Sequence, residues 1–206
     1  MRRAAYVHMA SPRSRSEDRA EIFERADALV IVVADGAGGV TGGATASDAL
    51  VEMARAVAQN TALDVCDAGL WGALFGEVDA ALAKKMAGET TGIVLVLGSH
   101  GLVGVSAGDS EAWVVGLTGL DDLTQRQKRA RLGSGRAAPV SFSRPRLDGT
   151  LIVGTDGLFK YATSEQIASV VRDSEVATAP ERLTALVRLP SGRLHDDVAI
   201  VAVAGT

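Results

Sequence analysis

The chain has 206 residues, of which 47% are apolar and 22% charged, a composition typical of one globular domain. Its 21 Lys and Arg against 25 Asp and Glu leave a formal charge of −4, which argues against general nucleic-acid binding. The one cysteine, Cys66, excludes an intramolecular disulfide and a multi-cysteine zinc site. With only three histidines, any metal would be bound by oxygen ligands, which suit hard cations.

No segment of the sequence predicts membrane insertion or export. The longest apolar run, 28–34, is far shorter than the roughly 20 residues that a spanning helix needs. Arg2 and Arg3 are not followed by an apolar stretch, so no signal peptide is predicted. We therefore expect a cytoplasmic protein, monomeric, with neither a membrane nor a nucleic acid as partner.

In chain order, the first half of the sequence predicts one strand and two helices. The β-branched run 28–34 predicts a buried strand, which ends in the glycine-rich stretch 35–43. Apolar residues at helical spacing then predict a helix over 45–59, with Thr45 as its N-cap, and a second helix over 63–86.

The second half predicts mostly strands. Apolar runs indicate strands at 92–97, 102–106, 112–115, 151–154 and 198–203. Thr163 and Gln166 have the spacing of a capping box, and a last helix is predicted near 180–189, whereas 119–149 is weakly patterned. Since several strands follow one another through short hairpins, we predict an α+β fold of antiparallel sheets with helices on their outer faces.

Acidic residues recur where the predicted strands end or turn, at Asp35, Asp109, Asp156 and Asp196, with the pair Glu17 and Asp18 upstream. Carboxylates at strand ends can meet on one rim of a sheet, where their mutual repulsion favours divalent cations that activate a water. Asp-Gly is also a common turn dipeptide. Spacing alone therefore leaves a metal site and a set of ordinary turns equally open.

Six short motifs occur in order along the chain: Arg13-x-x-x-Glu17-Asp18, Asp35-Gly36-Ala-Gly-Gly39, Gly88-Glu-Thr90-Thr91, Gly108-Asp109-Ser110, Thr155-Asp156-Gly157-Leu158 and Asp196-Asp197-Val198. With these motifs, the sequence from about residue 13 to its end resembles the metal-dependent type 2C (PPM) serine/threonine protein phosphatases. Each motif is weak alone, and their order makes the resemblance specific.

This resemblance implies a four-layer α-β-β-α sandwich, in which two antiparallel sheets pack face to face with helices on both outer sides. It implies hydrolysis of phosphoserine and phosphothreonine in proteins, the targets of a serine/threonine kinase. The nucleophile would be a water that bridges the metals and attacks phosphorus. The cofactors would be two or three divalent cations, Mn²⁺ or Mg²⁺.

The resemblance also assigns roles to single residues. Asp35 would bridge two cations, helped by the carbonyl of Gly36. Asp156 and Asp196 would complete the ligands of the first cation, and Glu17 would serve the second.

Further residues are assigned in the same way. Asp109 would join Asp156 in holding a third cation. Asp18 and Asp197 would support the ligands from outside, and Arg13 would bind the substrate phosphate through its guanidinium fork. Arg13 thus joins the aspartates 35, 156 and 196 as the residues expected to act in catalysis.

The sequence departs from the family pattern in ways that bear on activity. Glu111 stands where the motif after Asp109 carries arginine, Asp197 replaces asparagine, and the flap region, about 119–149, is short within a single domain spanning 1–206. A catalytically weak regulatory or phosphopeptide-binding module that keeps the fold is therefore the alternative to an enzyme. The basic residues of 126–146 could dock a phosphorylated substrate or form a solvated loop.

Overall fold

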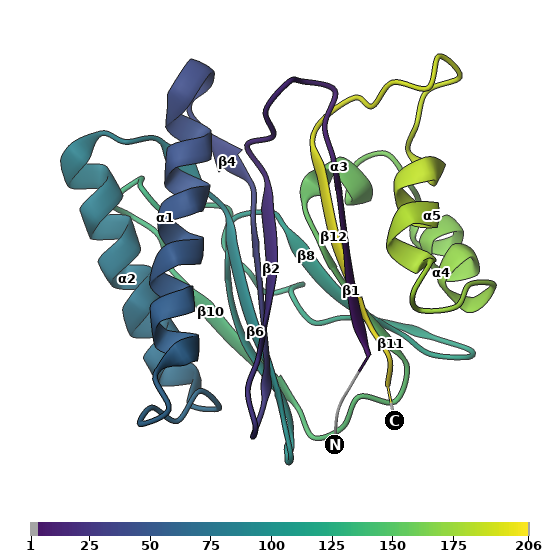
Figure 1. Cartoon of the computed structure of the whole chain (residues 1–206), viewed down its shortest axis with the longest axis horizontal. Coiled ribbons are helices and arrows are strands. Elements are labelled where there is room, and N and C mark those ends of the chain that lie inside the picture. Colours follow the sequence, from purple (N-terminus) through teal and green to yellow (C-terminus); the bar gives the residue numbers. More distant parts are fainter. Residues whose placement is uncertain (1–3, 206) are drawn as a thin grey trace.

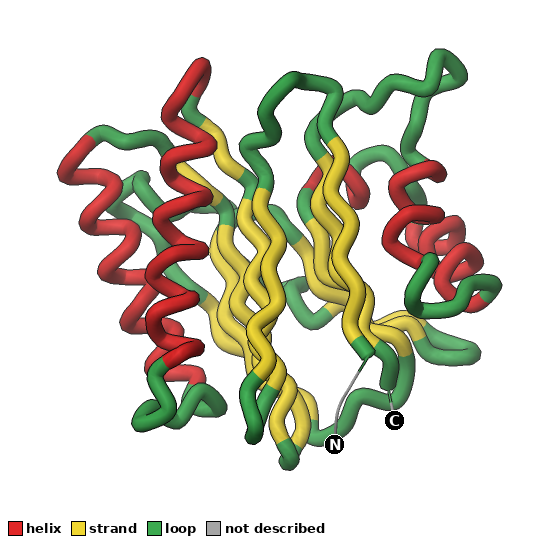
Figure 2. Tube along the Cα trace, in the orientation of Figure 1, coloured by secondary structure: helices red, strands yellow, loops and turns green. Residues whose placement is uncertain are grey.

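The computed structural model describes residues 4–205, and for residues 39–41 the backbone alone. Two five-stranded sheets pack against each other, and helices cover the outer face of each sheet (Figures 1 and 2). The α+β fold and its four α-β-β-α layers are thus confirmed. Within the described residues, no helix is both long enough and apolar enough to cross a membrane.

The first sheet combines strands from both ends of the chain. Its antiparallel order is β1 (Ala5–Ala10), β12 (Val198–Val203), β11 (Thr150–Gly154), β8 (Glu111–Val115) and β9 (Leu120–Asp122). In the register, Val201 lies between Val7 on β1 and Val153 on β11. All six residues of β12 are buried, because side chains on both of its faces are covered.

The second sheet is also antiparallel, in the order β10 (Val140–Arg144), β7 (Gly101–Ala107), β6 (Gly92–Gly98), β3 (Leu29–Ala34) and β2 (Arg19–Glu24). The predicted strand at 28–34 is confirmed as β3, and all its residues are buried. A short pair, β4 (Gly36–Ala37) with β5 (Glu89–Thr90), continues beyond the end of β3.

Helices form the two outer layers. The second sheet is covered by α1 (Gly39–Gln59) and α2 (Ala68–Lys85), and the first by α3 (Asp156–Phe159), α4 (Ser164–Arg172) and α5 (Ala179–Leu186) (Figure 1). The capping box predicted at Thr163 is present, with Gln166 as its partner.

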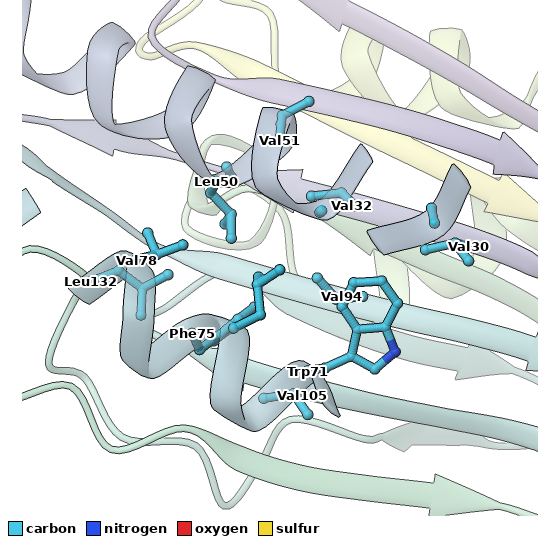
Figure 3. Packing of buried hydrophobic residues seen from close by; sticks show 14 of the residues in the cluster. Val30, Val32, Leu50, Val51, Trp71, Phe75, Val78, Val94, Val105 and Leu132 are labelled. Carbon is cyan, nitrogen blue, oxygen red and sulfur yellow. The ribbon is translucent and has the colours of Figure 1, made fainter. Parts of the chain in front are cut away.

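Three apolar clusters hold these layers together. Residues such as Ile31, Leu95 and Val201 fill the space between the sheets. Outside the second sheet, Trp71 and Phe75 of α2 lie in the cluster that joins both helices to the strands (Figure 3). The indole nitrogen of Trp71 donates to the carbonyl of Val65 at 2.8 Å, so this buried polar group is satisfied.

Both predicted helices of the first half begin at the wrong residue. The first starts at Gly39, so Thr45 lies inside it rather than at its N-cap. Glycines in its first turns are required by packing: a Cβ on Gly43 would lie 2.7 Å from the carbonyl oxygen of Gly36. The second starts at Ala68, because the side chain of Asp67 caps it by accepting from Gly69 N.

The weakly patterned segment 119–149 contains regular structure that the sequence did not predict. It supplies β9, which is an edge strand of the first sheet, and β10, which is an edge strand of the second sheet. Edge strands need only one apolar face, and both of these are only partly buried. Their residues therefore carry little of the pattern that marks a strand.

Candidate metal centre

The strand directions bring the acidic residues to one edge of the sandwich, uppermost in Figure 1. Asp35 follows β3, Asp109 lies just beyond β7, and Asp156 begins α3 after β11. Because the neighbouring strands are antiparallel, β2 and β12 start at this same edge. Asp18 precedes β2, and Asp197 precedes β12.

Three of these carboxylates form a tight cluster. Asp35, Asp109 and Asp156 each offer an oxygen, and the three oxygens all lie within 4.8 Å of one another. The side chain of Asp156 is only 8% exposed. Carboxylates this close repel one another strongly unless a cation lies between them.

Burial makes the negative charge of this region costly. It raises the pKa of Asp18 to about 9, and repulsion from Asp35 adds to the effect. Burial likewise raises the pKa of Asp35 to about 7. Repulsion from Asp156 adds to this rise, whereas attraction to Arg131 opposes it. In both cases the charged form is disfavoured until positive charge is supplied.

Two carboxylate oxygens here lack a hydrogen-bond partner. Among the described residues, Asp18 Oδ2 and Asp109 Oδ1 are buried and accept no hydrogen bond. Buried polar atoms are almost always satisfied in native proteins, so these orphans indicate a missing partner. Clustered oxygen donors with excess negative charge fit a hard divalent cation.

Arg13 gathers two further predicted ligands at the rim. Its Nη1 donates to Glu17 at 2.6 Å and its Nη2 to Asp196 at 3.0 Å. Glu17 and Asp196 therefore meet at this guanidinium rather than within the three-carboxylate cluster. The charge of Asp196 still helps to raise the pKa of Asp35.

Asp197 ties this rim to the first sheet. Its side chain accepts a hydrogen bond from the hydroxyl of Ser11 at 2.5 Å and from the backbone N–H of Glu17 at 2.7 Å. Asp197 is 3% exposed and immediately precedes β12. Its carboxylate thus positions the segment that carries Arg13 and Glu17.

Thr91 fixes the position of Asp35. Its hydroxyl accepts from the backbone N–H of Asp35 at 3.0 Å and shares a 2.6 Å hydrogen bond with the hydroxyl of Ser110. Its own N–H donates to the carbonyl of Asp35 at 2.8 Å. Thr91 therefore holds Asp35 against the turn that contains Asp109.

Gly36 lies where three backbone segments converge. A Cβ on this residue would lie 2.2 Å from the carbonyl oxygen of Gly43 and 2.9 Å from that of Glu17. Only glycine permits this approach, which brings the start of α1 and the Glu17 segment against Asp35.

Lys160 and Arg131 were not predicted as part of the site. Lys160 Nζ forms an ion pair with Asp156 Oδ2, and Arg131 Nη2 lies 3.6 Å from Asp109 Oδ1. The hydrogen bond to Asp156 raises the pKa of Lys160. The spacing of four residues between Lys160 and Asp156 was visible in the sequence, but it brings them together only because α3 is helical.

Glu111, the departure from the arginine of the family pattern, lies outside the cluster. It accepts a hydrogen bond from Trp113 Nε1 at 2.8 Å. Burial, with repulsion from Asp122, raises its pKa. Its side chain therefore packs along β8.

Comparison with known proteins bears on the fold. No family model matches the sequence, and no curated protein matches it. Among solved structures, a bacterial serine phosphatase is 19% identical with a TM-score of 0.84, covering 98% of both chains. Serine/threonine phosphatase Stp1 from Staphylococcus aureus is 19% identical with a TM-score of 0.83, covering 99% of this chain and 95% of that one.

The catalytic domain of the serine/threonine protein phosphatase PstP, solved with two manganese ions, is 20% identical with a TM-score of 0.78. The match covers 100% of this chain and 98% of that domain. The chain therefore has the fold of bacterial PPM serine/threonine phosphatases over its whole length, as the sequence motifs predict.

Proposed function

We propose that this protein is a metal-dependent phosphatase that hydrolyses phosphoserine and phosphothreonine in proteins. The observation that carries the proposal is the convergence of Asp35, Asp109 and Asp156, with oxygens within 4.8 Å of one another. These residues come from three different strand ends of a fold that bacterial serine/threonine phosphatases share. The orphaned oxygen of Asp18 beside them adds to the demand for cations.

Two or three divalent cations, Mn²⁺ or Mg²⁺, would be held by the predicted ligands Asp35, the carbonyl of Gly36, Asp156, Asp196, Glu17 and Asp109. Bound cations would activate a water for attack on phosphorus and offset the charge that develops on the phosphoryl oxygens. The protein's contribution is to fix the ligands: Thr91 holds Asp35, and Asp197 holds the backbone of Glu17.

Arg13 would bind the substrate phosphate. Its side chain is 49% exposed on the rim of the acidic cluster, and its two terminal nitrogens already engage carboxylates as a fork. The same fork matches two oxygens of a phosphate. Once cations bind Glu17 and Asp196, the guanidinium is free to turn to the substrate.

The substrate would be a phosphorylated protein, the target of a serine/threonine kinase, met by a cytoplasmic, monomeric enzyme. The basic segment 126–146 supports docking of such a substrate beside the site. Gly108 N donates to the carbonyl of Lys128 at 2.9 Å, so this segment lies directly against the turn that carries Asp109. Arg126 and Arg129 are exposed there.

The test is hydrolysis of p-nitrophenyl phosphate and of a phosphothreonine peptide by the purified chain. We expect activity with Mn²⁺, loss in EDTA, and a loss of at least about 100-fold in Asp35→Asn and in Asp156→Asn. Asp173→Asn, an exposed aspartate at the end of α4, is the matched control. Turnover without metal, or unchanged activity in both site variants, would refute the proposal.

The hydrolysis assay, combined with a calorimetric titration of the same peptide, addresses the alternative function. Glu111, Asp197 and the short flap region are the features that favour a catalytically weak phosphopeptide-binding module. Calorimetric binding of the peptide without turnover at saturating Mn²⁺ would support the module over the enzyme.

A further inference from the structure

Two side-chain cations flank the acidic cluster on the side of Asp109 and Asp156. Lys160 forms an ion pair with Asp156, and Arg131 lies 3.6 Å from Asp109. Both carboxylates belong to the cluster whose oxygens lie within 4.8 Å of one another. Asp156 therefore already has a hydrogen-bonded positive partner supplied by the chain itself, and Asp109 has a guanidinium within ion-pair distance.

The fold holds both cations in place. Lys160 is one turn along from Asp156, and its backbone N–H donates to the carbonyl of Asp156 at 2.9 Å. Arg131 precedes Leu132, which is fully buried and exchanges two backbone hydrogen bonds of 2.9 Å with Thr90. Arg131 thus projects from an anchored bridge beside β5, not from a free loop.

The charge balance of the site in its metal-free pairing matches two divalent cations. Its carboxylates are Glu17, Asp18, Asp35, Asp109, Asp156, Asp196 and Asp197. The cations paired with them are Arg13, Arg131 and Lys160. With every group ionised, seven negative and three positive charges leave four negative charges, which two divalent cations neutralise.

We propose that Lys160 and Arg131 take the place of a third divalent cation, so that this site binds two divalent cations and not three. The inference rests on the proposed function and deepens it. Lys160 engages an oxygen of Asp156 that a third cation would need, and the positive charges of Lys160 and of Arg131 beside Asp109 repel such a cation. A tethered ammonium and guanidinium are lost only by mutation, whereas a bound cation exchanges with solvent.

The test measures free Mn²⁺ by electron paramagnetic resonance, and the bound Mn²⁺ is the total minus the free ion. This measurement does not depend on turnover. The whole chain is titrated as wild type, Lys160→Met, Arg131→Met and the double variant. Lys84→Met and Arg129→Met, at exposed positions, are the matched controls. We expect two ions per chain in the wild type and controls, and a third in the double variant, bound at least about tenfold more tightly than any third ion in the wild type.

Thermal unfolding in EDTA gives a second readout. Removing either cation leaves its carboxylate unpaired, so the melting temperature without metal should fall in Lys160→Met and Arg131→Met, and Mn²⁺ should restore it. Lys160→Arg keeps the charge and should retain two ions and the wild-type melting temperature.

Three Mn²⁺ ions bound by the wild type, or two by a folded double variant, would overturn this inference and leave the proposed function standing. No Mn²⁺ bound by the wild type would overturn both. Should the double variant fail to fold, an unchanged third-ion affinity in both single variants overturns the inference in the same way.

Discussion

Gly157 packs against the backbone of Asp197 so closely that a Cβ built on Gly157 would lie 2.0 Å from the carbonyl oxygen of Asp197. The contact joins the start of α3, which carries Asp156, to the segment that carries Asp196. Hydrogen bonds beside it reinforce the junction: Thr155 N donates to the carbonyl of Ala199 at 3.1 Å, and Ala199 N donates to the hydroxyl of Thr155 at 3.0 Å.

Gly157→Ala should therefore destabilise the protein and weaken metal binding together. The added methyl group meets backbone atoms that cannot rotate away, which costs about 1–3 kcal/mol of unfolding free energy. Urea unfolding and calorimetric Mn²⁺ titration measure the two effects. Gly76→Ala is the control, because Gly76 is an exposed residue of α2 and nothing lies within 4 Å of a Cβ built on it; this variant should gain about 0.5–1 kcal/mol. Wild-type stability in Gly157→Ala would contradict the packing described.

Without metal, stability should fall as the pH rises. The carboxyl groups of Asp18 and Asp35, with folded-state pKa values of about 9 and about 7, keep protons that the unfolded chain releases near pH 4. Between these pKa values the folded state binds more protons than the unfolded state. The contribution of the two protonated carboxyl groups to the unfolding free energy is therefore lost as the pH rises from about 4 to about 9. Melting temperatures in EDTA at pH 5, 7 and 9 measure this loss.

Asp18→Asn is the variant that isolates this effect. It removes the group with the most strongly raised pKa, so its melting temperature should fall less between pH 5 and pH 9 than that of the wild type. Saturating Mn²⁺ should flatten the pH dependence of the wild type as well. An identical slope in wild type and Asp18→Asn would show that this carboxyl group is not the cause.

Arg13→Ala should weaken substrate binding while leaving the fold intact. Losing a charge-assisted hydrogen-bonding fork to phosphate corresponds to about 10- to 100-fold in kcat/KM. Arg13→Lys restores the charge without the fork and should recover only part of the loss. Arg15→Ala removes an arginine of the same loop that pairs with Asp48 at 3.4 Å, and should have little effect on kcat/KM. Equal losses of kcat/KM in Arg13→Ala and Arg15→Ala would mean that the positive charge of the loop as a whole, and not a specific contact of Arg13, supports substrate binding.

Thr91→Val should lower both stability and Mn²⁺ affinity. The substitution keeps the shape of a fully buried side chain but leaves Asp35 N and the Ser110 hydroxyl without their partner, a cost of about 1–3 kcal/mol. Thr91→Ser retains the hydroxyl and should bind Mn²⁺ as the wild type does. Matching behaviour of the Val and Ser variants would mean that the hydroxyl does not position Asp35.

The sequence by itself determined the features that depend on local patterning. The apolar run at 28–34 predicts β3 because both faces of that strand are buried, and the capping box at Thr163 is a contact within one turn. The six ordered motifs, among them those around Asp35 and Asp156, also predicted the four-layer fold through their resemblance to the PPM phosphatases.

Only the tertiary structure decided the features that depend on distant segments meeting. The start of α1 follows from the contact of Gly43 with Gly36, and the edge strands β9 and β10 follow from sheets already formed by other strands. The pairing of Arg131 with Asp109 likewise needs Leu132 to be anchored on Thr90. Charge, unlike hydropathy, has no period along the chain, so the balance of carboxylates and cations at the site emerges only when the strand ends converge.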